Sequence, residues 1–586
     1  MSRLLIDMDR DISHAINYHE ATKHSEASLA TSRHYLDFAN KPIPFKVYLE
    51  LPSVTLPTNF PAPEVKALNC MRDSIVQGSY DGTKDLTRFP ENTNVSSHAR
   101  VVDLADVTEI LFFSAGITRE IKYSHGNYYM RAASATGALY PIELYLVCDD
   151  LSSDLTAGVY HFSPASFSLT QIRKGNYKNY LSATAANNRD IANSSFVIIL
   201  TSFAWRNAWK YQARSYRHWF WDSGVIVANL LATTNAMGLP ARLIMGFVDD
   251  DLNQLLCLEE QKESSIVMVA IGEEDSGHNV TLSKQHAKVD TLSQVSIPKI
   301  RPLSRKGDVN YPEICNVNQA SKLTSRQDVI DWIHNAHRDG KLISTKLNSP
   351  QKNDANKTNG YTVIAKELDQ IVENSRSLKE TILWRGSSRE FARTAISFSA
   401  LKAILYFSTR GIPMDFFKSE DSLIDIYFIA NAVEGLKPGA YYYRHNASAT
   451  NPNTSIDKVK EITNSRNISG YLCLGQSLFS DASVVFFLMT NLQSVLNSLG
   501  NRGYRASQFE AGVIAGRIYL SAYAIGIGAS GSTFFDDAVT EFLSPHASSK
   551  STMIAVGVGV PAYKAKPGAI LPARLTKEQL LTQDFI

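Results

Sequence analysis

The chain contains the same sequence pattern twice, and this repeat constrains the fold more than any other feature. Tyr504 stands 288 positions after Tyr216, and the residues that follow both tyrosines match at the same offset as far as Leu255 and Leu543. The matched positions in the first copy are Tyr216, Arg217, Gly224, Val225, Ile226, Ala236, Gly238, Ala241, Phe247, Asp249 and Leu255. An ungapped register over about forty residues indicates duplicated structural units. The sequence therefore predicts two similar halves in tandem.

Segments outside this register also match once small gaps are allowed. The further pairs are 110–114 with 404–408, 142–147 with 424–429, and 266–272 with 553–559. The last pair is rich in β-branched residues, which predicts a buried strand in each half. Asp103 and Ser397 precede the first helical pattern of each half. Their side-chain oxygens can accept free backbone N–H groups, so both are predicted N-caps.

These patterns predict an α+β fold. Each half reads as helix, strand, hairpin-like strand, long helix, short helix and strand, which indicates few strands in a mixed sheet covered by helices. The predicted division is a lead-in at 1–60, a first domain at 61–275, a linker at 276–310 and a second domain at 311–586. Residues 344–360 show no hydrophobic period and are predicted to form a flexible insertion in the second domain.

Composition excludes several classes of function. Lys and Arg number 59 against 57 Asp and Glu, so no whole-chain field attracts nucleic acid or an anionic membrane. The 5 cysteines are widely spaced without a CxxC pair, which argues against a metal site or a disulfide framework and favours a reducing, cytoplasmic compartment. Residues 223–241 are long enough to span a membrane but include Asn229 and Pro240. We expect a buried helix there and no membrane partner.

Three segments resemble a known family. Arg385-Gly-Ser-Ser-Arg389 resembles the RxSxR phosphate-binding motif of flavin-dependent nitroreductases. Residues 131–141, RAASATGALYP, resemble the SAGALYP loop of the SagB-type dehydrogenase branch, and parts of residues 18–46 resemble its N-terminal portion. The resemblance implies two nitroreductase-like domains packed as an intramolecular pseudo-dimer. It also implies FMN as the cofactor, bound between the halves.

The resemblance assigns cofactor-binding residues to different halves. By resemblance, the phosphate is held by Arg385, Ser387, Arg389, Lys564 and Lys566, and the ring loop is formed by Arg131, Ser134, Ala135, Thr136 and Gly137. The segment opposite the phosphate motif, 91–95, has no cation, and Glu273, Glu274 and Asp275 stand where the second half has lysines. The segment opposite the ring loop, 416–423, has no glycine and adds carboxylates. One complete flavin site per chain is therefore expected.

Two further segments complete the expected site. Residues 526–533 are predicted to form a glycine-rich loop in which Gly531, Ser532 and Thr533 approach the flavin and donate N–H groups that stabilise its reduced form. Lys210 and Tyr211 resemble the Lys-Tyr pair of SagB-type azoline oxidases. When hydride leaves a substrate, a tyrosinate, or a lysine whose pKa a nearby Arg214 or Arg217 lowers, can take the accompanying proton.

Several of these residues can instead have purely structural or solvent-facing roles. Arg385 and Arg389 can be solvated surface cations, and Lys210 and Tyr211 can be a snorkelling lysine and a core tyrosine. The aromatic run 219–221 is interpreted as packing between the halves rather than as a substrate surface.

The predicted function is an FMN-dependent dehydrogenase or oxidase that removes two hydrogens from an azoline-like heterocycle. The resemblance implies a small-molecule or peptide substrate, such as a ribosomally made peptide, and a cyclodehydratase as candidate partner. One alternative is an NAD(P)H-dependent nitro or quinone reductase. The other is a degenerate flavin-fold scaffold or a peptide-binding partner, since half of the motifs are lost.

Overall fold

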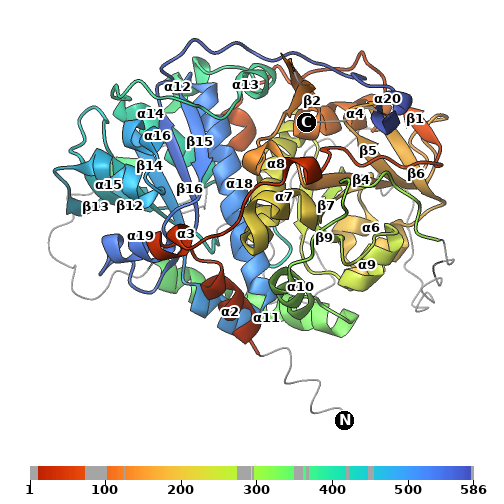
Figure 1. Cartoon of the computed structure of the whole chain (residues 1–586), viewed down its shortest axis with the longest axis horizontal. Helices are drawn as coiled ribbons and strands as arrows, with labels where there is room; N and C mark the ends of the chain where they lie inside the picture. The colour runs from red at the N-terminus through yellow and green to blue at the C-terminus, as the bar shows by residue number, and fades with distance from the viewer. Residues whose placement is uncertain are drawn as a thin grey trace, which may run out of the picture.

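The computed structural model describes residues 11–72, 102–124, 126–272, 292, 296–348, 361–363, 368–417, 421–445 and 454–582. Two seven-stranded sheets lie on opposite sides of a pair of long helices, α8 and α18 (Figure 1). No helix of these residues is long and apolar enough to cross a membrane. Likewise, the described residues contain no group of three His, Cys, Asp or Glu side chains placed to bind a metal ion.

The two sheets have the same strand order. In the first half it is β1-β6-β5-β4-β7-β9-β8, and in the second it is β10-β13-β12-β11-β14-β16-β15. The first sheet contains β1 (Ser53–Thr55), β4 (Ile142–Cys148), β5 (Gly158–Ser163), β6 (Ser168–Lys174), β7 (Phe196–Phe203), β8 (Ala241–Ile244) and β9 (Glu263–Ile271). The second contains β10 (Tyr361–Val363), β11 (Asp425–Ala430), β12 (Gly439–Arg444), β13 (Thr454–Glu461), β14 (Val484–Thr490), β15 (Gly528–Ser532) and β16 (Ser551–Gly559). The matching order confirms the tandem repeat.

The helices repeat as well. The first half has α4 (Leu104–Ala115), α5 (Lys178–Thr184), α6 (Arg189–Ala192), α7 (Ala204–Tyr211), α8 (Ser215–Ala236) and α9 (Asp249–Leu255). The second has α13 (Leu378–Trp384), α14 (Phe398–Ser408), α15 (Ser465–Leu472), α16 (Ser477–Asp481), α17 (Leu492–Leu499), α18 (Arg502–Ala524) and α19 (Asp536–Leu543). Both predicted N-caps are confirmed, because Asp103 accepts the N–H of Asp106 and Ser397 accepts that of Ala400.

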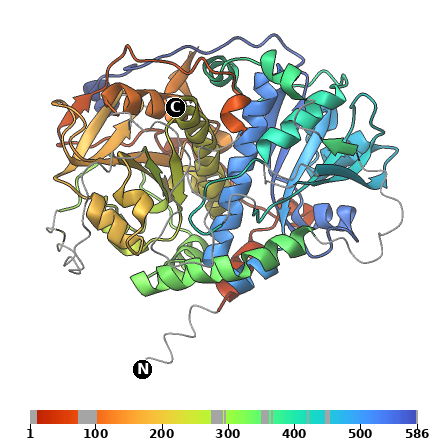
Figure 2. The same ribbon diagram turned by 180° about the vertical axis from the view of Figure 1, so that it is seen from behind.

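Several elements lie outside the repeated core. They are α2 (Ser13–Ala21), α3 (Glu26–Ala30), α10 (Pro312–Ala320), α11 (Arg326–Asn348), α12 (Asp369–Glu373), α20 (Lys577–Thr582) and the hairpin of β2 (Ile117–Tyr123) and β3 (Gly126–Arg131). Short 3-10 turns form η2 (Phe38–Asn40), η3 (Asn69–Met71), η4 (Thr136–Ala138) and η5 (Gln212–Arg214). The helix α11 runs across the base of both halves (Figure 2).

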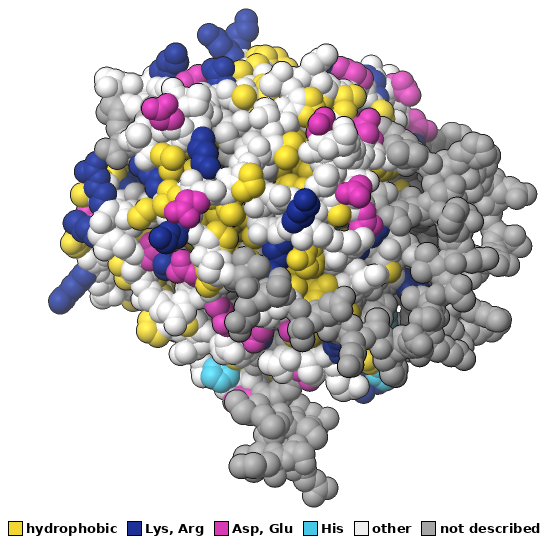
Figure 3. All heavy atoms as spheres, turned by 90° about the vertical axis from the view of Figure 1, so that its right-hand side faces the viewer, with side chains coloured by type: hydrophobic (Ala, Val, Ile, Leu, Met, Phe, Trp, Pro, Cys, Tyr) yellow, Lys and Arg dark blue, Asp and Glu magenta, His cyan; other side chains and the backbone are white. Residues whose placement is uncertain are grey.

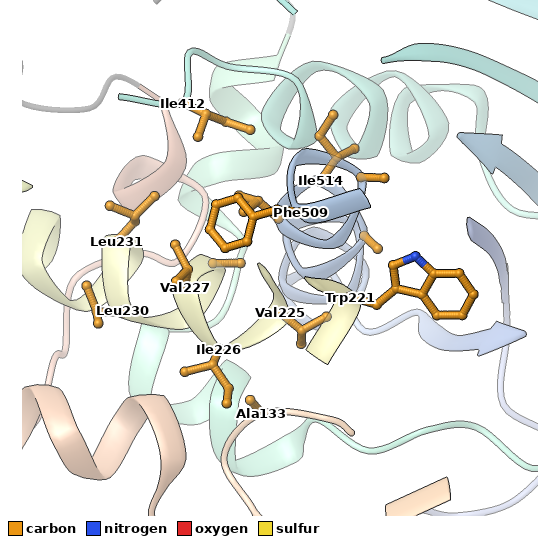
Figure 4. Packing of buried hydrophobic residues seen from close by; sticks show 14 of the residues in the cluster. Ala133, Trp221, Val225, Ile226, Val227, Leu230, Leu231, Ile412, Phe509 and Ile514 are labelled. Carbon is orange, nitrogen blue, oxygen red and sulfur yellow. The ribbon is translucent and has the colours of Figure 1, made fainter. Parts of the chain in front are cut away.

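The helices α8 and α18 pack closely because two glycines meet. A Cβ atom on Gly224 would lie 2.6 Å from the carbonyl carbon of Gly512, so a larger residue does not fit at this crossing. Val225 and Phe509 belong to the apolar cluster around the crossing (Figure 4). The Trp221 indole N–H donates to Gln508 Oε1 at 2.6 Å, which confirms that residues 219–221 pack between the halves.

The two ends of the chain cross to the opposite half. Near the N-terminus, Ala15 N–H donates to the side chain of Asn501, and α3 lies beside α19 (Figure 1). Near the C-terminus, Leu575 N–H donates to the Ala165 carbonyl and Arg574 pairs with Glu120 of the first half. Each half is therefore held by a segment that belongs to the other.

Four expectations differ from the structure. Strands are numerous rather than few, because apolar segments such as β7 and β14 form inner strands of the two sheets. The predicted loop at 526–533 contains the edge strand β15, whose small residues fit beside β16. Residues 344–348 of the predicted insertion continue α11, and 349–360 lie outside the described residues. Finally, α9 begins at Asp249 and α19 at Asp536, 287 positions apart, although the two helices end at Leu255 and Leu543, 288 positions apart.

Candidate functional site

The first arginine of the predicted phosphate motif reaches across to the other half. Arg385 follows α13, is 6% exposed, and donates from Nε to the Ala132 carbonyl at 2.6 Å and from Nη2 to the Arg131 carbonyl at 2.7 Å. Burial lowers the pKa of its guanidinium. Since 131 and 132 open the predicted ring loop, this one side chain joins the two predicted parts of the site.

The other cations predicted to bind the phosphate lie on two neighbouring segments of chain. Ala562 N–H donates to the Glu390 carbonyl, and Phe391 forms a bridge with Pro561, so the motif runs beside the last strand's extension. This pairing places Arg389 next to the segment that contains Lys564 and Lys566, and all three side chains are exposed. Ser387 is half-buried near them, at 3.4 Å from the Tyr519 hydroxyl. The predicted phosphate cations thus share one surface.

The ring loop is fixed from below by a buried carboxylate. Asp222 of α8, which is 3% exposed, accepts the Thr136 N–H at 2.9 Å and the Thr136 hydroxyl at 2.7 Å. Gly137 follows with φ of 64° and an exposed backbone, a conformation that favours glycine. A narrow cavity of about 10 Å³, lined in part by Ser134, Ala135 and Asp222, lies behind the loop. This cavity has room for about one water molecule.

Arg131 supports the loop from the other side. Its Nη2 donates to the Pro44 carbonyl at 2.6 Å, and its guanidinium stacks over the Tyr140 ring at 4.7 Å. Burial and neighbouring Arg206 lower its pKa to about 10, although Glu143 opposes them. Because Arg131 is 3% exposed, it positions the loop and does not face solvent.

The predicted catalytic pair lies at the end of α7, beside the loop. A Cβ atom on Gly137 would be 2.8 Å from the Tyr211 hydroxyl, so this hydroxyl lies against the loop. Burial and the charge of Asp222 raise the pKa of Tyr211 well above its usual value, which makes the predicted tyrosinate unfavourable at neutral pH. The Lys210 ammonium lies 5.3 Å above the Tyr211 ring and is half-exposed.

The cations expected to act on Lys210 are occupied elsewhere. Arg214 and Arg217 are buried and both pair with Asp536 of the second half, at 2.9 Å and 2.7 Å. The second half mirrors this cluster, since Arg502 and Arg505 pair with Asp249 at 2.6 Å and 2.7 Å. Lys41 is a cation near Lys210. Burial and the charge of Lys210 lower the pKa of Lys41. The two arginines therefore join the halves instead of tuning Lys210.

The strand β15 contributes the predicted glycine, and the helix α18 contributes two tyrosines that the sequence did not reveal. Gly531 N–H donates to the Tyr519 hydroxyl at 2.5 Å, and Tyr523, one turn later on α18, lies 3.3 Å from the Ser388 hydroxyl. At the 288 offset the first half has Leu231 and Asn235, so both hydroxyls are single-copy features that the repeat alignment could have revealed. Ser532 accepts a hydrogen bond from Gln476, and Thr533 Oγ1 is buried without a hydrogen-bond partner among the described residues.

The corresponding edge in the first half is covered. Leu243, which matches Gly531, donates its N–H to the Pro413 carbonyl at 2.8 Å and accepts the Asp415 N–H at 2.9 Å. The Asp415 carboxylate also accepts the N–H groups of Met245 and Gly246. The second half's own chain thus fills the edge of β8, which leaves no room for a ligand against that strand.

Only some of the positions that match these motifs in the opposite half belong to the described residues. Residues 91–95 and Glu273, Glu274 and Asp275 lie outside the described residues, as do 418–420 of the segment opposite the ring loop. The described part of that segment includes Leu423, whose N–H donates to Glu510 at 2.9 Å. Glu510 stands 288 positions after Asp222, so the two carboxylates hold equivalent segments in the two halves.

Comparison with known proteins identifies the family. The model of the nitroreductase family matches residues 98–273 and again 382–559, which together are more than half of the chain. The chain belongs to the nitroreductase family. It contains two copies of the family's domain, which confirms the resemblance and explains the two equivalent sheets.

Relatives of this nitroreductase-family chain include peptide-processing proteins. It is 24% identical over 141 residues to the microcin B17-processing protein McbC of Escherichia coli, covering 23% of this chain and 52% of McbC. It is 26% identical over 207 residues to the trifolitoxin-processing protein TfxB of Rhizobium leguminosarum, covering 33% of this chain and 56% of TfxB. The chain therefore spans about half the length of these curated relatives.

A solved structure shares the fold over nearly the whole length. A protein of Anabaena variabilis assigned as a nitroreductase superposes with a TM-score of 0.66 at 22% identity. The match covers 94% of this chain and 99% of that one. It supports the arrangement of both halves, and the chemistry must be argued from the residues themselves.

The residues fit an anionic, planar cofactor such as FMN. Exposed Arg389, Lys564 and Lys566 offer charge to a phosphate, and arginine pairs with phosphate through two parallel N–H bonds. The exposed backbone at Gly137 and Gly531 allows a flat ring to approach closely. Arg385 fits as the link between these two regions, because its Nε and Nη2 already bond to loop carbonyls.

Proposed function

We propose that the chain is an FMN-dependent dehydrogenase of the SagB type, with one flavin site built from both halves. The observation that carries this proposal is the pair of hydrogen bonds from Arg385 to the ring-loop carbonyls, which brings the phosphate motif and the loop together. The covered edge of β8 supports a single site, since the equivalent place in the other half is filled by residues 413–415. The halves thus act as the two subunits of a pseudo-dimer.

In this proposal, each group has one task. Arg389, Lys564 and Lys566 bind the phosphate, with Ser387, and Arg131, Ser134, Ala135, Thr136 and Gly137 form the wall for the ring. Gly531, Ser532 and Thr533 would provide the opposite edge, where the Gly531 N–H now donates to the Tyr519 hydroxyl. When bound, the flavin supplies the site that accepts a hydride from the substrate. Two tasks remain for the protein's own side chains: to accept the proton and to orient the substrate.

The protein's own acid and base follow from the geometry of α7. The raised pKa of Tyr211 keeps its hydroxyl protonated, so it orients the substrate as a hydrogen-bond donor. Lys210, whose ammonium lies 5.3 Å from the centre of the Tyr211 ring, is the group we assign to accept the proton that accompanies hydride loss. An azoline ring that loses both becomes an aromatic azole, and its electrons pass on to oxygen.

The substrate class rests on the relatives. McbC and TfxB are named for processing microcin B17 and trifolitoxin, which supports a processing role for this chain. The azoline ring on a ribosomally made peptide and the cyclodehydratase partner rest on the resemblance of residues 131–141 and of Lys210 and Tyr211 to the SagB-type branch. The test is anaerobic mixing of FMN-loaded protein with a thiazoline-containing peptide, followed by the flavin absorbance. Bleaching with loss of two hydrogens from the peptide is expected. Bleaching by NADPH and not by the peptide would instead favour a nitro or quinone reductase.

Replacing Arg389 tests the phosphate site. Arg389→Ala removes a charged hydrogen-bond donor, which is worth about 1.5–3 kcal/mol, so FMN affinity should fall roughly tenfold or more. Fluorescence quenching of FMN on titration measures this change. Arg393→Ala is the matched control, because Arg393 is an exposed cation on the same segment that pairs with Asp481. Equal affinity in the wild type and Arg389→Ala would favour the scaffold alternative.

A further inference from the structure

Three separate elements meet at one buried carboxylate beneath the ring loop. Asp222 belongs to α8 and accepts both the N–H and the hydroxyl of Thr136 from the loop. Its other oxygen accepts the side-chain N–H of Asn207, which belongs to α7, at 3.3 Å. Asn207 is completely buried, and its Oδ1 has no hydrogen-bond partner among the described residues.

These contacts determine where the Tyr211 hydroxyl lies. Asn207 is one turn before Tyr211 on α7, and Thr136 directly precedes Gly137, against which the hydroxyl rests. We infer that Asp222 is the positioning residue of the candidate site, whose carboxylate fixes the ring loop and α7 in one arrangement. This inference rests on the proposed function, because it concerns how the loop presents itself to FMN.

The second half offers a natural comparison. Glu510 also binds its loop segment, through the Ser422 hydroxyl at 2.6 Å and the Leu423 N–H at 2.9 Å. The residue that matches Asn207 is Val495, which cannot bond to a carboxylate. The second half therefore keeps the contact to the loop but lacks the contact to the helix that precedes α18. The three-way junction is specific to the half that contains Lys210 and Tyr211.

The junction can change with protonation. Burial raises the pKa of Asp222 to about 7, although Thr136 and Asn207 oppose the shift. Tyr211 of α7 and Tyr140 of the loop interact electrostatically with Asp222, and His218 lies one turn before it on α8. Burial keeps all three neutral near pH 7, since it lowers the pKa of His218 and raises those of both tyrosines. A protonated Asp222 could donate to the free Oδ1 of Asn207 after an amide flip, but would hold Thr136 more weakly.

Asp222→Asn imitates the protonated form and tests the inference. At about pH 8 the carboxylate is charged, so FMN should bind the variant about tenfold more weakly than the wild type, as loss of a charged hydrogen bond requires. At about pH 5.5 both proteins present a neutral group, and their affinities should converge. The FMN phosphate titrates near pH 6 in every variant. The ratio of the two affinities therefore isolates Asp222.

Stability distinguishes positioning from a merely structural role. The folded-state pKa of Asp222 lies above its unfolded value of 3.8, so the ionised group costs stability at about pH 8. This cost starts to decline as the pH falls below about 7 and is lost completely only below the unfolded value. Asp222→Asn should therefore raise the thermal midpoint at pH 8 while weakening FMN binding. Glu510→Gln, whose pKa is also raised to about 7 by burial, should raise the midpoint and leave FMN binding unchanged.

Thr136→Val provides a second variant that leaves α8 unaltered. It removes the hydroxyl bond to Asp222 and keeps the N–H bond, so it should weaken FMN binding at pH 8 and have a smaller effect at pH 5.5. An Asp222→Asn protein with wild-type FMN affinity, or with the same affinity ratio at both pH values, would overturn the inference alone. Wild-type protein that binds no FMN would overturn the proposed function and the inference with it.

Discussion

Lys210→Met should reduce the turnover of a heterocyclic substrate by about two to four orders of magnitude, the usual contribution of a positioned base. Tyr211→Phe should also slow turnover, by less, since it removes a hydrogen-bond donor and not the proton acceptor. Neither change touches the phosphate cations, so FMN affinity should stay within about twofold. Single-turnover reduction of the bound flavin, measured beside the FMN dissociation constant, separates the two effects.

The pH dependence of the turnover rate and a control variant test the roles of Lys210 and Tyr211 further. Because the pKa of Tyr211 is raised, deprotonation of its hydroxyl should not appear in the rate profile near neutral pH. Lys437→Met removes an exposed lysine of the second half that pairs with the exposed Glu461, and this variant should turn over normally. Full activity in both Lys210→Met and Tyr211→Phe would show that these two residues serve packing and solvation and not catalysis.

Asp536→Asn should cause the largest loss of stability. Asp536 is buried and pairs with Arg214 and Arg217 of the other half, and removing one partner from a buried ion cluster costs about 3–5 kcal/mol. Asp537→Asn is the matched control, because its carboxylate is 77% exposed and pairs only with Lys23. Exposed ion pairs contribute about 0–1 kcal/mol. Urea unfolding at neutral pH measures both changes.

The sign of the pH effect follows from the lowered pKa of Asp536. The two arginines hold this pKa below its unfolded value of 3.8, so the stabilisation is present above that value and is lost as the pH falls through the folded-state pKa. The difference between wild type and Asp536→Asn should therefore stay constant from neutral pH to about pH 5 and shrink only in stronger acid. Equal losses in Asp536→Asn and Asp537→Asn would contradict the cluster's role in joining the halves.

The repeat predicted much of the fold because it is a regular pattern along the chain. The 288 offset located α8 and α18, and the caps at Asp103 and Ser397 were recognised because N-caps act on residues only three positions away. The strand β15 was missed because its glycines and serines are typical of loops. Only its pairing with β16, which is a tertiary contact, makes it a strand.

The candidate site was predicted less completely. Sequence motifs placed Arg385 at the phosphate, but its bonds to the carbonyls of 131 and 132 depend on how the halves pack. Asp222 escaped notice because its partners lie 86 and 15 positions away. Its counterpart at the same offset, Glu510, was a signal that the alignment already contained. Buried acids that recur in both copies are therefore worth singling out in duplicated chains.

The most direct test of one composite site is the number of FMN molecules bound per chain. Native mass spectrometry of the full chain at saturating FMN, with absorbance as a check on the amount of flavin, gives this number. We expect one FMN per chain, lost in Arg389→Ala at low cofactor concentration. Two FMN molecules per chain would contradict the inference that the covered edge of β8 excludes a second site. A chain that binds no FMN would contradict the composite site itself.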